Sequence, residues 1–398
     1  MRVPSLRAFT VKVLLVYAGC RLVSGIILAV VATRQVPTEW TGPVVSYLTF
    51  TAQWDGQWYK TIAEHGYPAS LPVSPVTGEV EQNPWAFYPL FPLLARLVMD
   101  LTGQDFWVAG STLSLLLGFG AALAMAWLLR DRLGDRAAVL VVGVWASYPA
   151  AVVLQVGYSE ATAMVLLTGY LLALSRERWL VATGLALLIG LTRPIAVPLV
   201  VVTLVAVWAR WGRRREQPVT RAEALSALAA VLGCAVAGLL WPALAWLATG
   251  DRAAYPRTMA AWRASDEIVP FRPWLDMAGY YFGPAWGPVW LAVAVVGLVV
   301  MVLGPWAARL GTQLRTWSLA YPAYLLVVLD PFTSIFRYLI PMFPLVAVLL
   351  GSGGRRRGSD SHAWMALRAG AVLVLFVVGQ WYWTDVLWRF VPPTDYPP

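Results

Sequence analysis

A polar stretch between residues 54 and 92 carries the side chains best suited to chemistry in this chain. It contains WDGQWYKTIAEHGYP at 54–68 and AFYPLFP at 86–92, and most of the remaining sequence is strongly apolar. Aromatic faces can stack on sugar rings, and a carboxylate such as that of Asp55 can take a proton from a hydroxyl group. The stretch therefore predicts a binding surface that combines aromatic residues with a base.

Three further short polar segments follow, each at the end of an apolar segment. They are Gly157-Tyr158-Ser159-Glu160, Thr192-Arg193-Pro194 and Phe336-Arg337-Tyr338. Arginine binds phosphate through a planar fork of N–H donors. Acids, arginines and aromatic residues on one membrane face are together suited to glycosyl transfer from a lipid phosphate. Phosphate is a weakly basic leaving group that needs no general acid, so one base at the acceptor hydroxyl suffices for inversion.

The first half of the polar stretch predicts a short helix over residues 56–65. Asp55 is a favoured N-cap type, and Gly66 is a favoured residue after a helix. Trp54, Trp58 and Ile62 recur every four positions and form one apolar face. We therefore expect an interfacial helix that lies flat on a membrane, with Asp55 on the water side.

The composition predicts an all-α polytopic membrane protein. Hydrophobic residues make up 59% of the 398 residues, charged residues make up 13%, and the mean hydropathy is +0.64. A soluble protein of this length has about twice that charged fraction. The net charge of +9 does not indicate nucleic acid, because the basic residues cluster in short runs between apolar stretches. We expect one integral-membrane domain over 1–398.

Apolar windows predict eleven membrane spans. Several are short for a bilayer core of about 30 Å, so we expect them to be tilted, or broken at Pro149, Pro194 or Pro341. The predicted spans are 10–33, 106–129, 137–155, 159–174, 179–191, 194–211, 223–248, 283–304, 316–329, 335–351 and 364–386.

The distribution of basic residues predicts the orientation. With a cytoplasmic N-terminus, the inner segments hold 19 of the 30 basic residues but only six of the 21 acids. This places a first large loop at 34–105, a second at 249–282 and the C-terminal tail outside the cytoplasm. The short polar segments described above are predicted on the same outer side.

Neither a metal nor a cofactor is expected. The two histidines, His65 and His362, are predicted on opposite sides of the membrane, and there is no glycine-rich phosphate loop. Cys20 and Cys234 both lie within predicted spans, so no disulfide framework is indicated.

The motifs resemble those of the GPI mannosyltransferase II (PIG-V-like) family of GT-C membrane glycosyltransferases. The resemblance rests on the segments at 54–68, 86–93 and 157–161, the Thr192-Arg193 break, and FRYLIPMFPL at 336–345, in the family's order. It implies a GT-C-type bundle, an extracytoplasmic site, an inverting mechanism and a mannose donor carried on polyprenyl phosphate.

The resemblance also implies roles for individual residues. Asp55 aligns with the catalytic base of the family's first loop. The residues implied around the donor phosphate and sugar are Arg193, Arg337, Glu160, Tyr158 and His65, and those for stacking on substrate are Trp54, Trp58, Tyr59, Tyr67 and Tyr88. Arg193 is followed by Pro-Ile rather than by the family's small polar and Gly pair, and residues 69–83 form an extra insert. The acceptor therefore stays open between a lipid, a glycan and a protein, and we expect a bacterial plasma membrane as the location.

Each of these residues also has a structural interpretation. Asp55 could only cap its helix, Glu160 could only stabilise a helix start, and the two site arginines could reach the lipid headgroups. His65 could be a capping residue, and the aromatic residues could form a membrane-interface belt. Arg21, within the first span, is expected to make a structural polar contact.

Two other functions remain alternatives at this stage. A lipid-linked sugar flippase or transporter would usually place its polar groups near the bilayer midplane and often shows a repeated half, whereas here they lie at the outer rim. A non-catalytic scaffold would not need an acid and arginines beside an aromatic surface.

Overall fold

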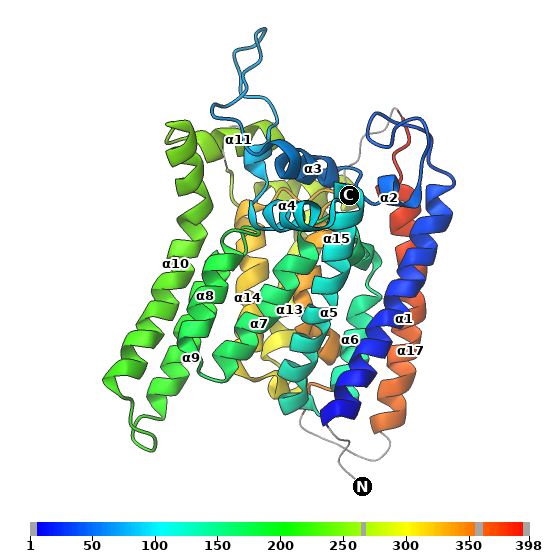
Figure 1. Ribbon diagram of the computed structural model, residues 1–398. Helices are drawn as coiled ribbons and strands as arrows, with labels where there is room; N and C mark the ends of the chain where they lie inside the picture. Colours follow the sequence, from blue (N-terminus) through cyan, green and yellow to red (C-terminus); the bar gives the residue numbers. More distant parts are fainter. Residues whose placement is uncertain (1–5, 264–267, 355–360, 393–398) are drawn as a thin grey trace.

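The computed structural model describes residues 6–263, 268–354 and 361–392, and its regular structure is helical (Figure 1). Two isolated β-bridges, Thr38 with Gly42 and Val73 with Val80, lie within these ranges. The predicted all-α fold class is confirmed. The helices are α1 (Leu6–Ala32), α2 (Tyr47–Phe50), α3 (Asp55–His65), η1 (Pro84–Ala86), α4 (Leu90–Thr102), α5 (Phe106–Leu133), α6 (Asp135–Ala146), η2 (Pro149–Gln155), α7 (Glu160–Ser175), α8 (Trp179–Ile189), α9 (Val197–Gly212), α10 (Arg221–Thr249), α11 (Ala254–Arg263), α12 (Arg272–Phe282), α13 (Gly287–Leu303), η3 (Pro305–Leu310), α14 (Gly311–Val328), α15 (Ile335–Tyr338), η4 (Ile340–Met342), α16 (Pro344–Leu349), α17 (Ser361–Trp383) and η5 (Thr384–Trp388).

Several helices have the length and apolar character of membrane spans. Among the described residues, α1, α5, α10 and the stretch His362–Trp388 each qualify alone. Two bent pairs bring the number to six if each pair is one span, and α7, α8 and α9 are shorter apolar helices. The chain thus has the fold of a polytopic membrane protein, while the count of eleven crossings stays a prediction.

Two predicted spans are not single helices. The segment 137–155 is broken between α6 and η2, which meet at 89° next to Pro149, one of the break points expected from the sequence. The segment 335–351 consists of α15, η4 and α16, and η4 contains Pro341, another of the break points expected from the sequence. Pro341 and Pro344 lack an N–H group, so a continuous helical hydrogen-bond ladder cannot run through them.

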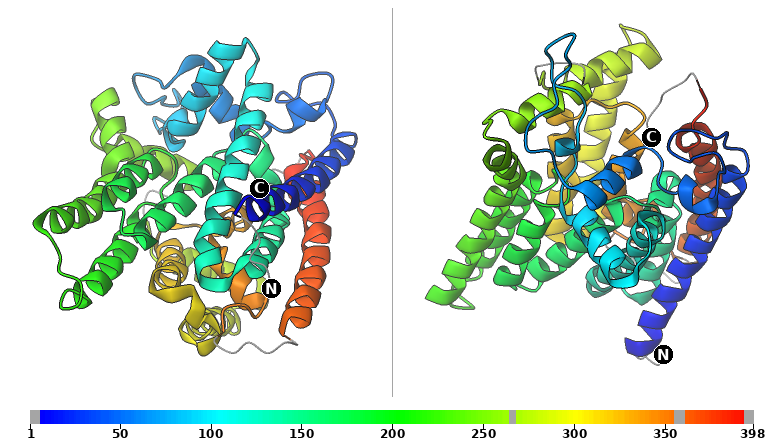
Figure 2. Two further views of the ribbon diagram at one scale, coloured as in Figure 1. Left: turned by 60° about the horizontal axis from the view of Figure 1, so that its bottom comes forward. Right: turned by 45° about the horizontal axis from the view of Figure 1, so that its top comes forward.

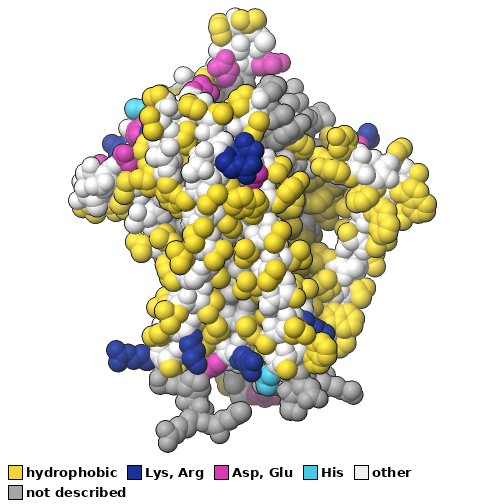
Figure 3. All heavy atoms as spheres, turned by 90° about the vertical axis from the view of Figure 1, so that its right-hand side faces the viewer, with side chains coloured by type: hydrophobic (Ala, Val, Ile, Leu, Met, Phe, Trp, Pro, Cys, Tyr) yellow, Lys and Arg dark blue, Asp and Glu magenta, His cyan; other side chains and the backbone are white. Residues whose placement is uncertain are grey.

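The two ends of the bundle differ in structure and charge. Helices α3, α4 and α11 lie across one end, which we call the site end, while the turn between α9 and α10 lies at the other, which we call the basic end (Figures 1 and 2). Figure 3 shows a broad hydrophobic band on one face, with several Lys and Arg side chains and a His along its lower edge. This separation agrees with the predicted charge asymmetry, although which end faces the cytoplasm stays a prediction.

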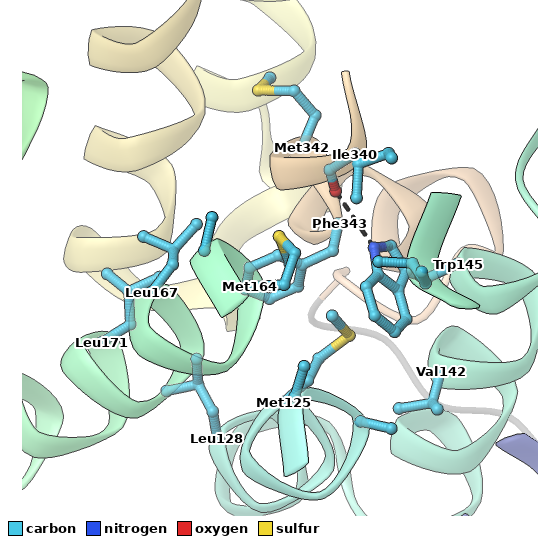
Figure 4. Packing of buried hydrophobic residues seen from close by; sticks show 14 of the residues in the cluster. Met125, Leu128, Val142, Trp145, Met164, Leu167, Leu171, Ile340, Met342 and Phe343 are labelled. Carbon is cyan, nitrogen blue, oxygen red and sulfur yellow. Dashed lines mark hydrogen bonds between the residues drawn. The ribbon is translucent and has the colours of Figure 1, made fainter. Parts of the chain in front are cut away.

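The centre of the bundle is a continuous apolar core. Met125, Val142, Met164 and Phe343 meet there from α5, α6, α7 and the segment after η4 (Figure 4). The indole N–H of Trp145 donates to the Ile340 carbonyl oxygen at 3.1 Å. This bond joins α6 to η4 and provides a partner for a backbone carbonyl in a segment broken by prolines.

Arg21 stabilises the break between α6 and η2. It is buried within α1, and its guanidinium donates to the carbonyl oxygen of Ala151 at 2.5 Å and to that of Ala146 at the end of α6. Gln380 of α17 donates to the Tyr148 carbonyl oxygen at 3.2 Å. The end of a helix leaves carbonyl groups unpaired and carries partial negative charge, so a buried cation is well placed here. Arg21 therefore has the structural polar role expected from the sequence.

We expect Arg21→Met to destabilise the protein, because two buried carbonyl groups lose their donor. Each unsatisfied group costs about 1–3 kcal/mol. Thermal unfolding of the purified variant in a membrane mimetic measures the effect, and Lys12→Met, at an exposed position of the same helix, is the control. Equal unfolding temperatures for the two variants would contradict this role.

Candidate active site

Helix α3 places Asp55 differently from the sequence prediction. The helix begins at Asp55 rather than at residue 56, and Trp54 occupies the N-cap position with a φ of 56°. The expected N-cap role of Asp55 is therefore wrong, since no side-chain cap is formed there. The end of the helix is as predicted, with Gly66 at a φ of 78°. The Asp55 carboxylate is consequently available for a partner outside its own helix.

That partner is Arg337 of α15. Its Nη1 atom donates to Asp55 Oδ2 at 2.8 Å and to Glu160 Oε1 at 3.0 Å. The same Glu160 oxygen lies 2.5 Å from Arg193 Nη1. Asp55, Glu160, Arg193 and Arg337 thus form one network, which we call the charge quartet, of two carboxylates and two guanidinium groups. The structure brings together four of the residues selected from the sequence, although they come from four separate segments.

The charge quartet is mostly shielded from solvent. The side chains of Glu160 and Arg337 are 4% and 6% exposed, and that of Asp55 is 20% exposed. A cavity of only about 10 Å³ lies between Glu160, Arg193 and Arg337, which is room for roughly one water molecule. The four side chains are packed against one another, and a larger ligand can enter only if they separate.

The guanidinium groups of Arg193 and Arg337 each lie over the aromatic ring of a tyrosine. The guanidinium of Arg337 lies 5.1 Å from the ring centre of Tyr158, and that of Arg193 lies 5.1 Å from the ring centre of Tyr338. A cation over an aromatic face is attracted to it, more strongly where water is excluded. The Tyr158 hydroxyl also accepts the backbone N–H of Asp55 at 3.1 Å. Tyr158 therefore lies at the site, as predicted, but it contacts protein groups.

Ser159 connects helix α3 with Arg193. Its hydroxyl bonds that of Tyr59 at 2.7 Å and accepts from Arg193 Nη1 at 3.4 Å. Burial raises the pKa of Tyr59, so its hydroxyl keeps its proton at neutral pH. Ser159 and Tyr338 were not expected as site residues, although each is a chain neighbour of one that was, Glu160 and Arg337.

Glu160 keeps one carboxylate oxygen without a hydrogen-bond partner. Oε1 accepts from both arginines, whereas Oε2 is buried and has none. A buried acceptor without a donor carries a desolvation cost of about 1–3 kcal/mol or more. An unsatisfied group of this kind at a polar cluster favours a ligand that brings an O–H or N–H donor.

Most aromatic residues expected to stack on substrate are used in packing instead. Trp54 is buried and donates its indole N–H to the Trp388 carbonyl oxygen at 2.7 Å. Tyr59 and Tyr88 are also buried, and Tyr67 donates to the Phe87 carbonyl oxygen at 2.8 Å. Their rings form the interior of the site end rather than an open surface.

Trp58 and Tyr67 are the two of the five that are only partly buried. Trp58 stacks on Phe87 with 5.8 Å between ring centres and touches Trp262 of α11. The segments 34–105 and 249–282 are further joined by Asn83, which exchanges hydrogen bonds with the Thr258 hydroxyl at 3.2 and 3.3 Å. No pattern in the sequence indicated this contact.

His65 lies apart from the charge quartet. Its side chain is 75% exposed, and its Nε2 atom lies 3.9 Å from a carboxylate oxygen of Glu64. The structure does not bring it to the donor position that the resemblance implied. Among the described residues, no group of three or more potential metal-ligating side chains occurs.

An apolar cavity of about 590 Å³ adjoins the charge quartet. Its walls come from α6, α12, α13, α14, η4, α16 and α17, and Ile340 borders both this cavity and the small polar one. Leu339, two residues after Arg337, also contributes to its wall. The site therefore combines paired charges with an apolar space beside them.

Comparison with known proteins identifies no family for this chain. No protein-family model and no curated protein matches it. Among solved structures, the chain is similar to the crystal structure of ArnT from Cupriavidus metallidurans bound to undecaprenyl phosphate, with a TM-score of 0.49 and 14% sequence identity. The similarity covers 89% of this chain and 62% of that chain, so the protein described here spans less than two thirds of the length of that structure.

Proposed function

We propose that this protein is an inverting GT-C glycosyltransferase of the membrane. It transfers mannose from polyprenyl-phosphate mannose to a lipid, glycan or protein acceptor at the extracytoplasmic face, with Asp55 as general base. The observation that carries this proposal is the charge quartet, in which two carboxylates and two arginines meet beside an apolar cavity. The choice of mannose rests on the resemblance of the sequence motifs.

The donor phosphate is assigned to Arg193 and Arg337. Two buried guanidinium groups next to each other offer N–H donors suited to phosphate oxygens. In the structure these guanidinium groups bind Glu160 and Asp55, so a phosphate competes with these carboxylates. Displacement of Asp55 from Arg337 removes the N–H donor that occupies its Oδ2 atom, so that this oxygen can accept the proton of the acceptor hydroxyl. The base is therefore set free only when the donor is bound.

The lipid chain of the donor is assigned to the apolar cavity. Its volume of about 590 Å³ lies within the range of roughly 300–1,000 Å³ that is usual for ligand pockets. Ile340 borders both the cavity and the charge quartet, so a phosphate on Arg337 can lead directly into a hydrocarbon chain. Burial of the chain contributes about 25 cal/mol for each Å² of apolar surface.

The unpartnered oxygen of Glu160 is assigned to a hydroxyl group of the donor sugar. This oxygen is the buried acceptor within the charge quartet that lacks a donor, and every hexose carries several hydroxyl groups. A sugar hydroxyl here removes the cost of leaving this oxygen unsatisfied. A site built to bond a hydroxyl rejects analogues that lack it.

The reaction then follows in one displacement. The acceptor oxygen forms a bond to the anomeric carbon while its proton passes to the Asp55 carboxylate. The bond between that carbon and the phosphate oxygen breaks, and the electron pair leaves with polyprenyl phosphate. Attack from the face opposite the phosphate inverts the configuration. The two arginines stabilise the negative charge that the phosphate gains.

Purified protein incubated with labelled polyprenyl-phosphate mannose and candidate acceptors tests the function. We expect acceptor-dependent release of polyprenyl phosphate together with transfer of the label to the acceptor. The same preparation in sealed vesicles measures movement of the intact donor across the bilayer. Movement of the donor without cleavage would replace the proposal with a lipid-linked sugar flippase.

A bulky residue in the apolar cavity is expected to weaken binding of long-chain donors. Ala294 of α13 lines the cavity, and Ala294→Trp fills part of it. Overpacking costs about 1–3 kcal/mol, so KM should rise roughly tenfold for a long polyprenyl chain. A short-chain, water-soluble donor should be affected much less. Val296→Trp, at an exposed position of the same helix that does not line the cavity, is the control, and an equal effect of the two variants would contradict the assignment.

A further inference from the structure

A second polar cavity lies at the basic end, on the opposite side of the bundle from the charge quartet. It has a volume of about 200 Å³. Four segments distant in the sequence form its walls, namely the α5–α6 turn, η3, the loop 351–354 and the first turns of α17. The volume is below the range of roughly 300–1,000 Å³ for drug-sized ligands, so the cavity suits a small polar group.

Cationic side chains dominate this cavity. Arg136 and Arg309 both line it, together with His362. A third arginine is close by, because a methyl group at Gly351 would lie 2.6 Å from Arg368 Nη1. Among the described lining residues Asp135 is the one acid, and its Oδ1 atom accepts from Arg130 Nε at 2.7 Å. The described side chains around the cavity therefore carry a net positive charge, which favours an anion.

The backbone holds one of these cations in place. Arg309 donates through Nη2 to the Arg132 carbonyl oxygen at 2.7 Å, and its backbone N–H donates to the Gly353 carbonyl oxygen at 2.8 Å. The loop 351–354 packs so closely that a Cβ atom at residue 353 would lie 2.4 Å from the Trp306 carbonyl oxygen. The wall is thus preorganised, which lowers the entropy cost of binding an anion.

The surroundings of the cavity place it at the level of lipid headgroups. Trp306 and Trp364 lie close to it in the chain and are 44% and 61% exposed, and tryptophan is enriched at membrane–water interfaces. The exposed side of α17 continues from this level with apolar residues, namely Leu367, Val374 and Leu375. Basic pockets between spans at the cytoplasmic side are typical sites for anionic lipid headgroups.

We infer that this cavity binds the phosphate headgroup of an anionic glycerophospholipid, with Arg136 and Arg309 on the phosphate and the acyl chains along α17. This site is separate from the proposed glycosyl-transfer site and does not depend on that function.

Binding of phosphatidylglycerol to the purified full chain, measured by native mass spectrometry in neutral detergent, tests the inference. Arg136 is exposed, so Arg136→Gln is expected to fold. It should weaken the affinity about tenfold, since a charge-assisted hydrogen bond is lost. Arg215→Gln, an exposed arginine at the same end that does not line the cavity, makes the same charge change and should leave the affinity unchanged.

Three results would overturn the inference. An equal loss of affinity in both variants would mean that the lipid binds through general attraction between a basic surface and an anionic lipid, and not in this cavity. Full displacement of the lipid by inorganic phosphate at an equal concentration would assign the cavity to free phosphate, because the acyl chains would then contribute nothing. Unchanged binding by Arg136→Gln would place the lipid elsewhere.

Discussion

Asp55→Asn is expected to retain the lipid-linked donor while losing transfer of the sugar. The amide has nearly the same shape as the carboxylate but cannot accept the proton of the acceptor hydroxyl. Loss of a general base typically lowers the rate by about 10²–10⁴-fold. Donor affinity should be equal or higher, because Asp55 no longer competes with the phosphate for Arg337, from which it lies 2.8 Å away.

Single-turnover transfer and equilibrium binding of the donor separate these two effects. Glu64→Gln makes the same acid-to-amide change on helix α3, where Glu64 contacts Lys60 at 3.8 Å and lies outside the charge quartet. This control should keep normal turnover. Near-normal turnover by Asp55→Asn would remove Asp55 as the base, and loss of donor binding together with turnover would assign it a role in binding.

Arg337→Gln is expected to weaken both the fold and donor binding. Arg337 neutralises two carboxylates, and Glu160 is almost fully buried. Complete loss of the partner of a buried charge costs about 3–5 kcal/mol. The cost here should be smaller, because Glu160 keeps Arg193 at 2.5 Å and Asp55 is 20% exposed. The donor phosphate also loses a guanidinium ligand, and a hydrogen bond to a charged group contributes about 1.5–3 kcal/mol.

A double variant distinguishes the two consequences of this change. Asp55→Asn combined with Arg337→Gln removes one negative charge with the positive one, so part of the stability should return while donor affinity stays low. Arg34→Gln provides a control at a surface pair, since Arg34 is 47% exposed and lies 2.9 Å from Asp385. Such exposed pairs contribute about 0–1 kcal/mol. Donor affinity equal to that of the wild type in Arg337→Gln would move the phosphate away from this residue.

The sequence by itself determined the class of the fold and the positions of most helices. Long apolar windows predict helices such as α1, α5 and α10 because a membrane span must pair its backbone groups within itself. The end of a helix could also be predicted where it depends on a single residue. Helix α3 ends before Gly66, which has a positive φ. The short polar segments that contain Asp55, Glu160, Arg193 and Arg337 could be recognised in the sequence, because a charged side chain beside an apolar segment carries a free-energy cost.

Only the tertiary structure decided which of these residues meet. Asp55 and Arg337 are 282 positions apart, and their hydrogen bond depends on how α3 and α15 pack at the site end. The same packing buries Trp54, Tyr59 and Tyr88, which by type alone could equally have formed an exposed surface. Hydropathy and capping act over a few neighbouring residues, whereas contacts between helices arise from the arrangement of the whole bundle. The sequence therefore selected the charged residues, and the packing of the helices made them one site.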